Sequence, residues 1–150
     1  ALPISGYGRI IFPDGSHYDG SWMDDKANGM GIFQHKNGSI YQGEVKDDKQ
    51  DGLGKETWPD SCSYYGTFKE GVKHGKGTFE FSSGDSYTGD FRENEMCGHG
   101  KFTWVDGRVY TGGWKSGKMD GQGVFTWPDN RRYEGQYAND EKNGYGTMTW

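Results

Sequence analysis

The stretch FPDGSHYDGSW, residues 12–22, decides the fold, because a turn signal is followed by Tyr, Gly and Trp at alternating positions. Pro presets φ for a turn, Asp caps the turn, and Gly tolerates a positive φ. Side chains of a strand alternate between its two faces, so Tyr18, Gly20 and Trp22 would share one face. The stretch therefore predicts a turn that leads into a strand with one aromatic face.

The same pattern recurs in frame every 23 residues along the chain. A tyrosine opens each unit, and a Gly follows two residues later: Tyr18, Tyr41, Tyr64, Tyr87, Tyr110 and Tyr133. A Gly-x-Gly pair comes next in every unit, and this fixed period is the signature of stacked repeats. We predict one array over 1–150, which we expect to be a segment of a longer protein. Its divisions are a partial repeat 1–17, full repeats 18–40, 41–63, 64–86, 87–109 and 110–132, and a partial repeat 133–150.

Each repeat has the pattern of a β-hairpin. The Tyr-x-Gly-x-aromatic segment forms one strand, and Gly-x-Gly-x-Phe forms the other, with Gly100, Phe102 and Trp104 on one face and Thr103 on the opposite face. Gly has no side chain, so a ring from a neighbouring strand can lie over its backbone. The predicted fold is all-β: an elongated solenoid of stacked antiparallel β-hairpins that forms a single twisted, grooved sheet.

Composition and charge narrow the class of protein. Only 31% of the chain is hydrophobic and the mean hydropathy is -1.03, which is too polar for a large globular core, yet 16% is aromatic, which argues against disorder. The net charge is -5 and no basic segment is present. This balance argues against binding to nucleic acid or to an anionic membrane. We expect Cys62 and Cys97 to be free thiols in a reducing compartment.

Catalytic and metal-binding patterns were not found. No Gly-x-Gly has the third Gly of a dinucleotide-binding motif, and the hydroxyl side chains are scattered over repeat positions. His74, Cys97 and His99 would come close in a stack, but a fourth zinc ligand is not evident, so we expect local packing there. We predict no catalytic residue, no metal site and no cofactor.

The six in-frame Tyr-x-Gly units and the Gly-x-Gly pairs resemble the MORN (membrane occupation and recognition nexus) repeat family over 6–150. The resemblance implies stacked hairpins and a non-catalytic module that holds a protein partner or dimerises. Members are often linked to membranes, cilia, flagella or the cell-cortex cytoskeleton. Val45 and Glu56 replace aromatic residues of the pattern, and the turn at 59–63 lacks its Gly, so we expect less regular packing in the second and third repeats.

The favoured interpretation is a protein-interaction scaffold that is not an enzyme. A peptide or helix in the groove, or a second copy of the chain as a homodimer, would contact the aromatic face. No nucleic acid is expected, and the location would be cytoplasmic, at the cytoskeleton, the cilium or a membrane. The predicted contact residues are Tyr41, Tyr64, Tyr87, Tyr110, Phe68, Phe91, Trp114, Trp58, Trp104 and Trp127.

Other functions stay open at this point. The chain could be a phosphoinositide-binding or membrane-binding module that uses the basic residues Lys69, Lys73, Lys115 and Lys118. It could be the regulatory repeat region of a larger enzyme such as a lipid kinase, or a spacer without a partner groove. The acidic balance of the chain counts against binding to phospholipid.

Overall fold

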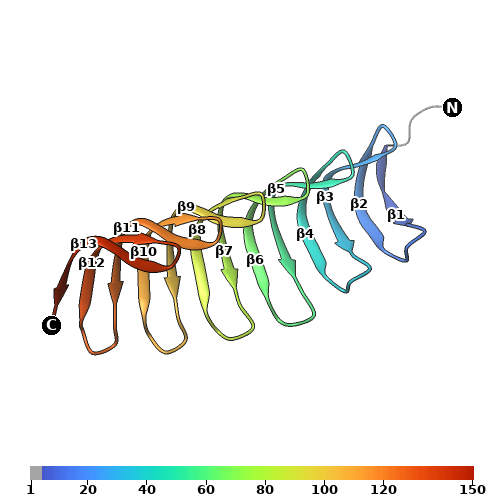
Figure 1. Ribbon diagram of the computed structural model, residues 1–150. Coiled ribbons are helices and arrows are strands. Elements are labelled where there is room, and N and C mark those ends of the chain that lie inside the picture. The colour runs from blue at the N-terminus through green and yellow to red at the C-terminus, as the bar shows by residue number, and fades with distance from the viewer. Residues whose placement is uncertain (1–4) are drawn as a thin grey trace. The chain divides into compact units, whose positions relative to one another are not determined.

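The computed structural model describes residues 5–150, so the first four residues of the predicted partial repeat 1–17 lie outside the described part. Within it the chain forms thirteen strands and no helix (Figure 1). By contact density the chain divides into an N-terminal unit that ends at Lys73 and a C-terminal unit that begins at His74. Within each unit, neighbouring strands pair antiparallel in chain order.

The strands alternate between a seven-residue and a nine-residue type after the first. Their bounds are β1 Gly6–Ile11, β2 His17–Met23, β3 Lys26–Gln34, β4 Ile40–Lys46, β5 Lys49–Thr57, β6 Ser63–Lys69, β7 Val72–Glu80, β8 Ser86–Arg92, β9 Glu95–Thr103, β10 Val109–Lys115, β11 Lys118–Thr126, β12 Arg132–Ala138 and β13 Glu141–Thr149. The prediction of an all-β fold of antiparallel hairpins with a 23-residue repeat is confirmed.

Two kinds of turn join the strands. The two-residue turns have positive φ at both positions, as at Asp47–Asp48 with φ 48° and 68°, which is the geometry whose twist matches that of a hairpin. The longer turns carry the PDGS-type signal, and Gly15 at φ 91° closes the first of them on the Phe12 carbonyl. Ser61 takes the glycine position of its turn at φ 75° and makes the equivalent bond to the Trp58 carbonyl. This turn therefore has the same hydrogen bonds as the others although it lacks Gly.

A β-bulge bends the hairpins at the Gly-x-Gly segment. In β8–β9, Gly89 pairs with Gly100 and the next pair is Asp90 with Cys97, so two residues of β9 are extra. One of them, Gly98, has a φ of 60°, a backbone conformation that glycine adopts more readily than residues with a side chain. The Asp90 carboxylate accepts a hydrogen bond from the backbone N–H of the other, His99, at 3.0 Å. Such bulges kink a strand and increase its twist, which the sequence pattern does not reveal.

The tyrosines of the repeat occupy the space that the second glycine leaves. A Cβ atom on Gly100 would lie 2.2 Å from the Tyr87 hydroxyl oxygen, so the ring covers the glycine backbone. The Tyr87 hydroxyl donates to the Asp90 carbonyl at 2.9 Å, next to the bulge. The same bond to the residue three positions on recurs from Tyr18, Tyr41, Tyr64, Tyr110 and Tyr133. One side chain therefore fills the glycine gap and binds a carbonyl at the bulge.

The core of each unit is a row of aromatic rings in edge-to-face contact. Tyr110 lies between Trp114 of its own repeat and Tyr137 of the next, with ring centroids 5.3 Å and 5.1 Å apart and planes nearly perpendicular. Tyr41 and Tyr64 flank Phe68 in the same way in the N-terminal unit. Edge-to-face pairs add to the free energy gained by burial alone. In each unit, the rings of the unit itself thus shield one face of the sheet from solvent.

Hydrogen bonds between the two-residue turns and the preceding repeat join successive hairpins. In the N-terminal unit, Asp48 N donates to the Ala27 carbonyl at 3.0 Å, and Ala27 N donates to the Asp48 carboxylate at 2.8 Å. In the C-terminal unit, Asp140 makes the same pair of bonds with Met119 at 3.0 Å and 2.8 Å. In each of these turns, the aspartate therefore binds the preceding repeat through both its backbone N–H and its carboxylate.

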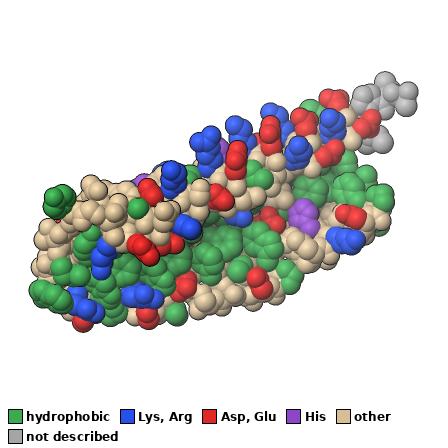
Figure 2. Space-filling model, in the orientation of Figure 1, with side chains coloured by type: hydrophobic (Ala, Val, Ile, Leu, Met, Phe, Trp, Pro, Cys, Tyr) green, Lys and Arg blue, Asp and Glu red, His purple; other side chains and the backbone are tan. Residues whose placement is uncertain are grey.

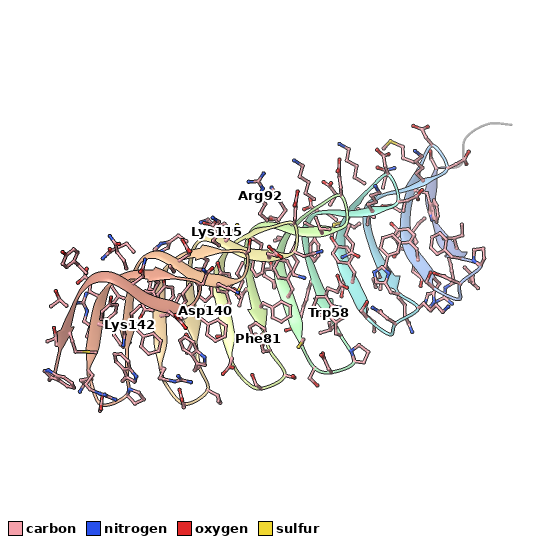
Figure 3. The ribbon with its side chains drawn as sticks, in the orientation of Figure 1. Trp58, Phe81, Arg92, Lys115, Asp140 and Lys142 are labelled. Atoms are coloured by element: carbon pink, nitrogen blue, oxygen red, sulfur yellow. The ribbon has the colours of Figure 1, made fainter. Side chains whose placement is uncertain are left out.

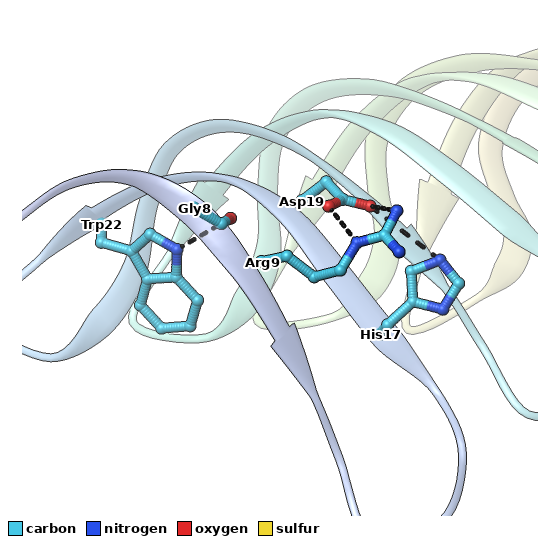
Figure 4. Close-up of polar contacts among 5 residues, drawn as sticks. All are labelled: Gly8, Arg9, His17, Asp19 and Trp22. Carbon is cyan, nitrogen blue, oxygen red and sulfur yellow. Dashed lines mark hydrogen bonds and ion pairs between the residues drawn. The ribbon is translucent and has the colours of Figure 1, made fainter.

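The opposite face of the first hairpin carries charged side chains. Figure 4 shows the Arg9 guanidinium donating to both carboxylate oxygens of Asp19, at 2.6 Å and 3.0 Å. His17 Nε2 lies 3.9 Å from the same carboxylate. On the aromatic side, Trp22 Nε1 donates to the Gly8 carbonyl at 3.2 Å. The alternation of polar and aromatic positions along β2 thus separates the two faces.

Candidate functional site

A continuous row of rings runs along the C-terminal unit beside the buried tyrosines. We call it the ring row, and its members are Phe81, Phe102, Trp104, Phe125 and Trp127. Successive centroids are 5.6, 4.6, 5.2 and 4.6 Å apart, so each ring contacts the next. The rings come from the ends of β9 and β11 and from the first residues of the turns that follow β7, β9 and β11. The Gly-x-Gly-x-Phe-x-aromatic pattern places them there once in every repeat.

The ring row lines an open trough. Phe125 is buried, whereas the other four members are only half-buried. Met96 and Met119 are also half-buried and share the aromatic face, because they pair in register with Phe91 and Trp114. Figure 2 shows the hydrophobic side chains of this unit in a hollow with charged side chains along its edges. We call this hollow the aromatic trough.

Cations stack on the two tryptophans of the trough. The Arg108 guanidinium lies 4.9 Å from the Trp104 ring centroid, and Arg131 lies 5.0 Å from that of Trp127. Asp106 accepts from Arg108 Nε at 2.9 Å and thereby orients the guanidinium. A pair of this geometry is attractive because the ring face is negative.

A lysine approaches the same trough from the last strand. Lys142 Nζ lies 5.3 Å from the Trp127 ring centroid and 5.1 Å from that of Tyr133. Figure 3 shows Lys142 and Phe81 on the enclosed side of the sheet, whereas Arg92 and Lys115 project away from the rings at the two-residue turns. Lys142 thus lies on the side of the trough, whereas Arg92 and Lys115 lie at the outer turns.

The N-terminal unit has a polar cluster where the C-terminal unit has rings. Gln50 Nε2 donates to Glu56 Oε1 at 2.8 Å, and its Oε1 lies 3.0 Å from His35 Nε2. Gln50 and Glu56 are buried at 6% and 8% exposure. Glu56 is visible in the sequence as a departure from the pattern, but Gln50 is not, because its position has no fixed residue type along the repeats. The two units therefore carry chemically different side chains at equivalent positions of the repeat.

The predicted aromatic contact residues fall into two groups. The first group is buried at 7% exposure or less and forms the core: Tyr41, Tyr64, Tyr87, Tyr110, Phe68, Phe91 and Trp114. Trp58, Trp104 and Trp127 are half-buried. The tyrosines lie over glycines, as Tyr87 does over Gly100, and Phe68, Phe91 and Trp114 pack edge-to-face against tyrosines. A partner can therefore reach the tryptophans more readily than the tyrosines.

The four predicted basic contacts divide between the two units. Lys69 is exposed, but Lys73 is half-buried, with its Nζ 5.3 Å from the Trp58 ring centroid. Burial lowers the Lys73 pKa, and the Glu56 carboxylate opposes that change. Lys115 and Lys118 are exposed and pair in register across a two-residue turn. Within the N-terminal unit, Lys69 and Lys73 thus lie in different surroundings.

The described residues do not provide a metal site of three or more His, Cys, Asp and Glu side chains. Cys97 is half-buried, and burial raises its pKa. Within residues 5–150 there is also no helix that could cross a bilayer.

Comparison with known proteins identifies the family. The MORN repeat model matches seven segments, at residues 4–17, 18–40, 41–63, 64–86, 87–107, 110–130 and 133–150. The chain therefore belongs to the MORN repeat family. A search of curated proteins gave no match.

Some solved structures are similar at low identity. The TCP domain of SAS-4 (dCPAP) of Drosophila melanogaster, in complex with a proline-rich motif of Ana2, is 12% identical with a TM-score of 0.38, over 88% of this chain and 90% of that chain. The G-box domain of the microcephaly protein CPAP is 13% identical with a TM-score of 0.38, over 97% and 99%. The TCP10 domain of Danio rerio CPAP, in complex with a STIL peptide, is 13% identical with a TM-score of 0.29, over 97% and 99%. At such low TM-scores these likenesses do not bear on the function of this chain.

Proposed function

We propose that the chain is a non-catalytic protein-interaction module that holds a segment of a partner protein in the aromatic trough. The observation that carries this proposal is the half-buried ring row of the C-terminal unit. Exposed aromatic rows mark partner sites, and tryptophan is enriched among the residues that dominate binding energy. Membership of the MORN family supports an interaction scaffold, and we propose that it acts at a cytoskeletal, ciliary or membrane-cortex structure.

The trough combines features that suit a peptide. Its rings offer large apolar surfaces at a low cost in side-chain entropy, and the half-buried methionines adapt to irregular partners. The guanidiniums on Trp104 and Trp127 supply hydrogen-bond donors at the edge of the apolar surface. A partner segment can therefore bury apolar side chains and still satisfy its polar groups.

A selection from a random peptide library tests this function. We expect peptides that bind the wild-type chain and that lose about 30-fold or more in affinity with Trp104→Ala or Trp127→Ala, because a buried aromatic anchor contributes about 2 kcal/mol. Lys101→Ala, at an exposed position of β9, is the matched control and should leave the affinity unchanged. Failure to select any peptide, or equal binding by the tryptophan variants, would reject the proposal.

The same variants separate a peptide-binding module from the alternatives. Flotation with phosphoinositide-containing vesicles, at low and high salt, tests capture by Lys69, Lys115 and Lys118, because salt screens exposed charges. Vesicle capture that only Lys69→Glu with Lys115→Glu removes would favour a membrane module instead. Sedimentation of the wild-type chain and of Trp104→Ala tests a homodimer, and dissociation caused by Trp104→Ala would make a second copy the occupant of the trough.

A further inference from the structure

We propose that the segment held in the aromatic trough is a polyproline II helix that presents an apolar residue to the rings at every third position. This inference rests on the proposed function, and it concerns only the C-terminal unit. Three features of the trough carry it: the spacing of its rings, the hydrogen-bond donors that its tryptophans present, and the guanidiniums beside them.

The spacing of the repeats matches the period of a polyproline II helix. Each repeat contributes two strands, and strands lie about 4.8 Å apart, so equivalent rings such as Trp104 and Trp127 recur about every 9.6 Å. Three residues of polyproline II rise about 9.3 Å and return to the same side of the helix. Two turns of α-helix rise about 10.5 Å over seven residues, and two residues of a strand rise about 6.7 Å. Of the three conformations, a polyproline II segment thus has the rise that differs least from the spacing of equivalent rings, and it presents the same side to each of them.

The tryptophans of the trough keep their N–H donors for a partner. Trp114 donates its Nε1 hydrogen to the Gly100 carbonyl at 3.1 Å. Within residues 5–150, the Nε1 groups of Trp104 and Trp127 have no such acceptor. The one buried side-chain nitrogen or oxygen without a partner in the described residues is Ser39 Oγ, so solvent reaches both indole nitrogens. The indole N–H groups of Trp104 and Trp127 can therefore donate hydrogen bonds to a bound partner.

These donors distinguish a polyproline II segment from an α-helix. Polyproline II has no internal hydrogen bonds, so every backbone carbonyl is free to accept. An α-helix uses its carbonyls internally except in its last turn. The Arg108 and Arg131 guanidiniums bind Asp106 and Asp129 through Nε, which leaves their terminal NH2 groups as further donors along the same edge. A row of donors beside a row of rings fits a ligand with free carbonyls between apolar residues.

Two labelled peptides of equal length test the inference by fluorescence anisotropy. The first repeats Pro-Pro-Leu and forms polyproline II, and the second is an amphipathic Leu–Lys–Glu helix without proline. The key variant is Trp104→Phe with Trp127→Phe, because it keeps both rings and removes both N–H donors. We expect the proline peptide to bind the wild-type chain, to lose about tenfold in affinity with this variant, since one hydrogen bond contributes about three- to tenfold, and to lose binding with the double change to Ala.

A third peptide, with glycine in place of every proline, keeps the leucine spacing but loses the preformed helix, and it should bind more weakly than the proline peptide. Preferential binding of the amphipathic helix, with equal affinity for the wild-type chain and the phenylalanine variant, would overturn the inference and leave the proposed function standing. If neither probe binds, the inference is also overturned, and the library selection described above decides separately whether the trough binds peptides. Circular dichroism of each variant shows that the fold is retained.

Discussion

The two glycines of each Gly-x-Gly pair have different physical roles. The first of the β9 pair, Gly98, is needed for its positive φ in the bulge, whereas the second, Gly100, is needed because the Tyr87 ring lies against its backbone. The sequence predicts the second role, since a ring over a glycine follows from the alternation of rings and glycines. It does not predict the first, because a bulge shifts the register without changing the period of the pattern.

Gly100→Ala should destabilise the chain by about 3 kcal/mol, because the added methyl group would overlap the Tyr87 ring and overpacking of this kind costs about 1–3 kcal/mol. Gly8→Ala is the matched control. Gly8 holds the same position of the repeat in β1, but the nearest atom to its added Cβ would be Trp22 Nε1 at 3.9 Å. That change should stay within about 0.5 kcal/mol. Equal losses in urea unfolding for both variants would contradict the role of the ring.

The candidate contact residues show what the repeat pattern cannot predict at the residue scale. The alternation assigns Tyr110 and Trp104 to the same face, and in the structure Tyr110 pairs with Phe102, whose ring contacts that of Trp104. Exposure differs because Tyr110 lies over Gly123 in the middle of the pairing, whereas Trp104 begins the turn that follows β9. The pattern gives the face of each ring but not its depth, since depth depends on how far the hairpin bends at the bulge.

At the scale of the element, the turns tolerate residues that the backbone disfavours. Glu70 and Glu93 have φ of 49° and 50° in two-residue turns, where Asn or Gly is the usual choice. The flanking strands fix this geometry through the pairing on both sides. The sequence predicted the longer turns from their Pro, Asp and Gly residues, but Glu-Gly and Glu-Asn are weak signals for the tight ones.

Ser61→Gly should stabilise the chain by about 1 kcal/mol, because serine at φ 75° bears a strain that glycine does not. Asn130→Gly provides the comparison, since Asn130 has φ 71° at the equivalent position and asparagine tolerates this region better than serine. Asn130→Gly should raise the free energy of unfolding by only about a few tenths of a kcal/mol. Thermal unfolding of both variants measures the difference, and a loss of stability in Ser61→Gly would show that the serine side chain has a stabilising contact.

For the whole molecule, the buried tyrosines set the response to high pH. Burial raises the pKa of Tyr64, Tyr110 and Tyr137 from 10.0 to about 12, and it also raises the pKa values of Tyr41 and Tyr87. The folded state therefore binds these protons more tightly than the unfolded state. The resulting stability is fully present below pH 10, the ordinary value, and is lost as pH rises through the folded pKa values.

We expect the free energy of unfolding to fall steeply between about pH 10 and pH 12, with several phenols ionising together as the sheet unfolds. Denaturant unfolding at a series of pH values measures the slope, and near-ultraviolet absorbance follows tyrosinate. A phenol titration that is complete near pH 10 while the β-sheet circular dichroism is unchanged would contradict the burial of the tyrosine row.

Successive repeats make equivalent contacts through turns such as that of Asp140 and through the Tyr–Gly pairs, so a whole repeat can be removed in frame. Removal of residues 87–109 would join strand ends that already have the same type of neighbour, since Tyr110 follows where Tyr87 stood. Removal of one residue fewer would turn every later ring to the other face of the sheet. Such a chain can change its length during evolution by duplication of whole repeats that reuse the same contacts, and each copy of 87–109 would add one more tryptophan equivalent to Trp104.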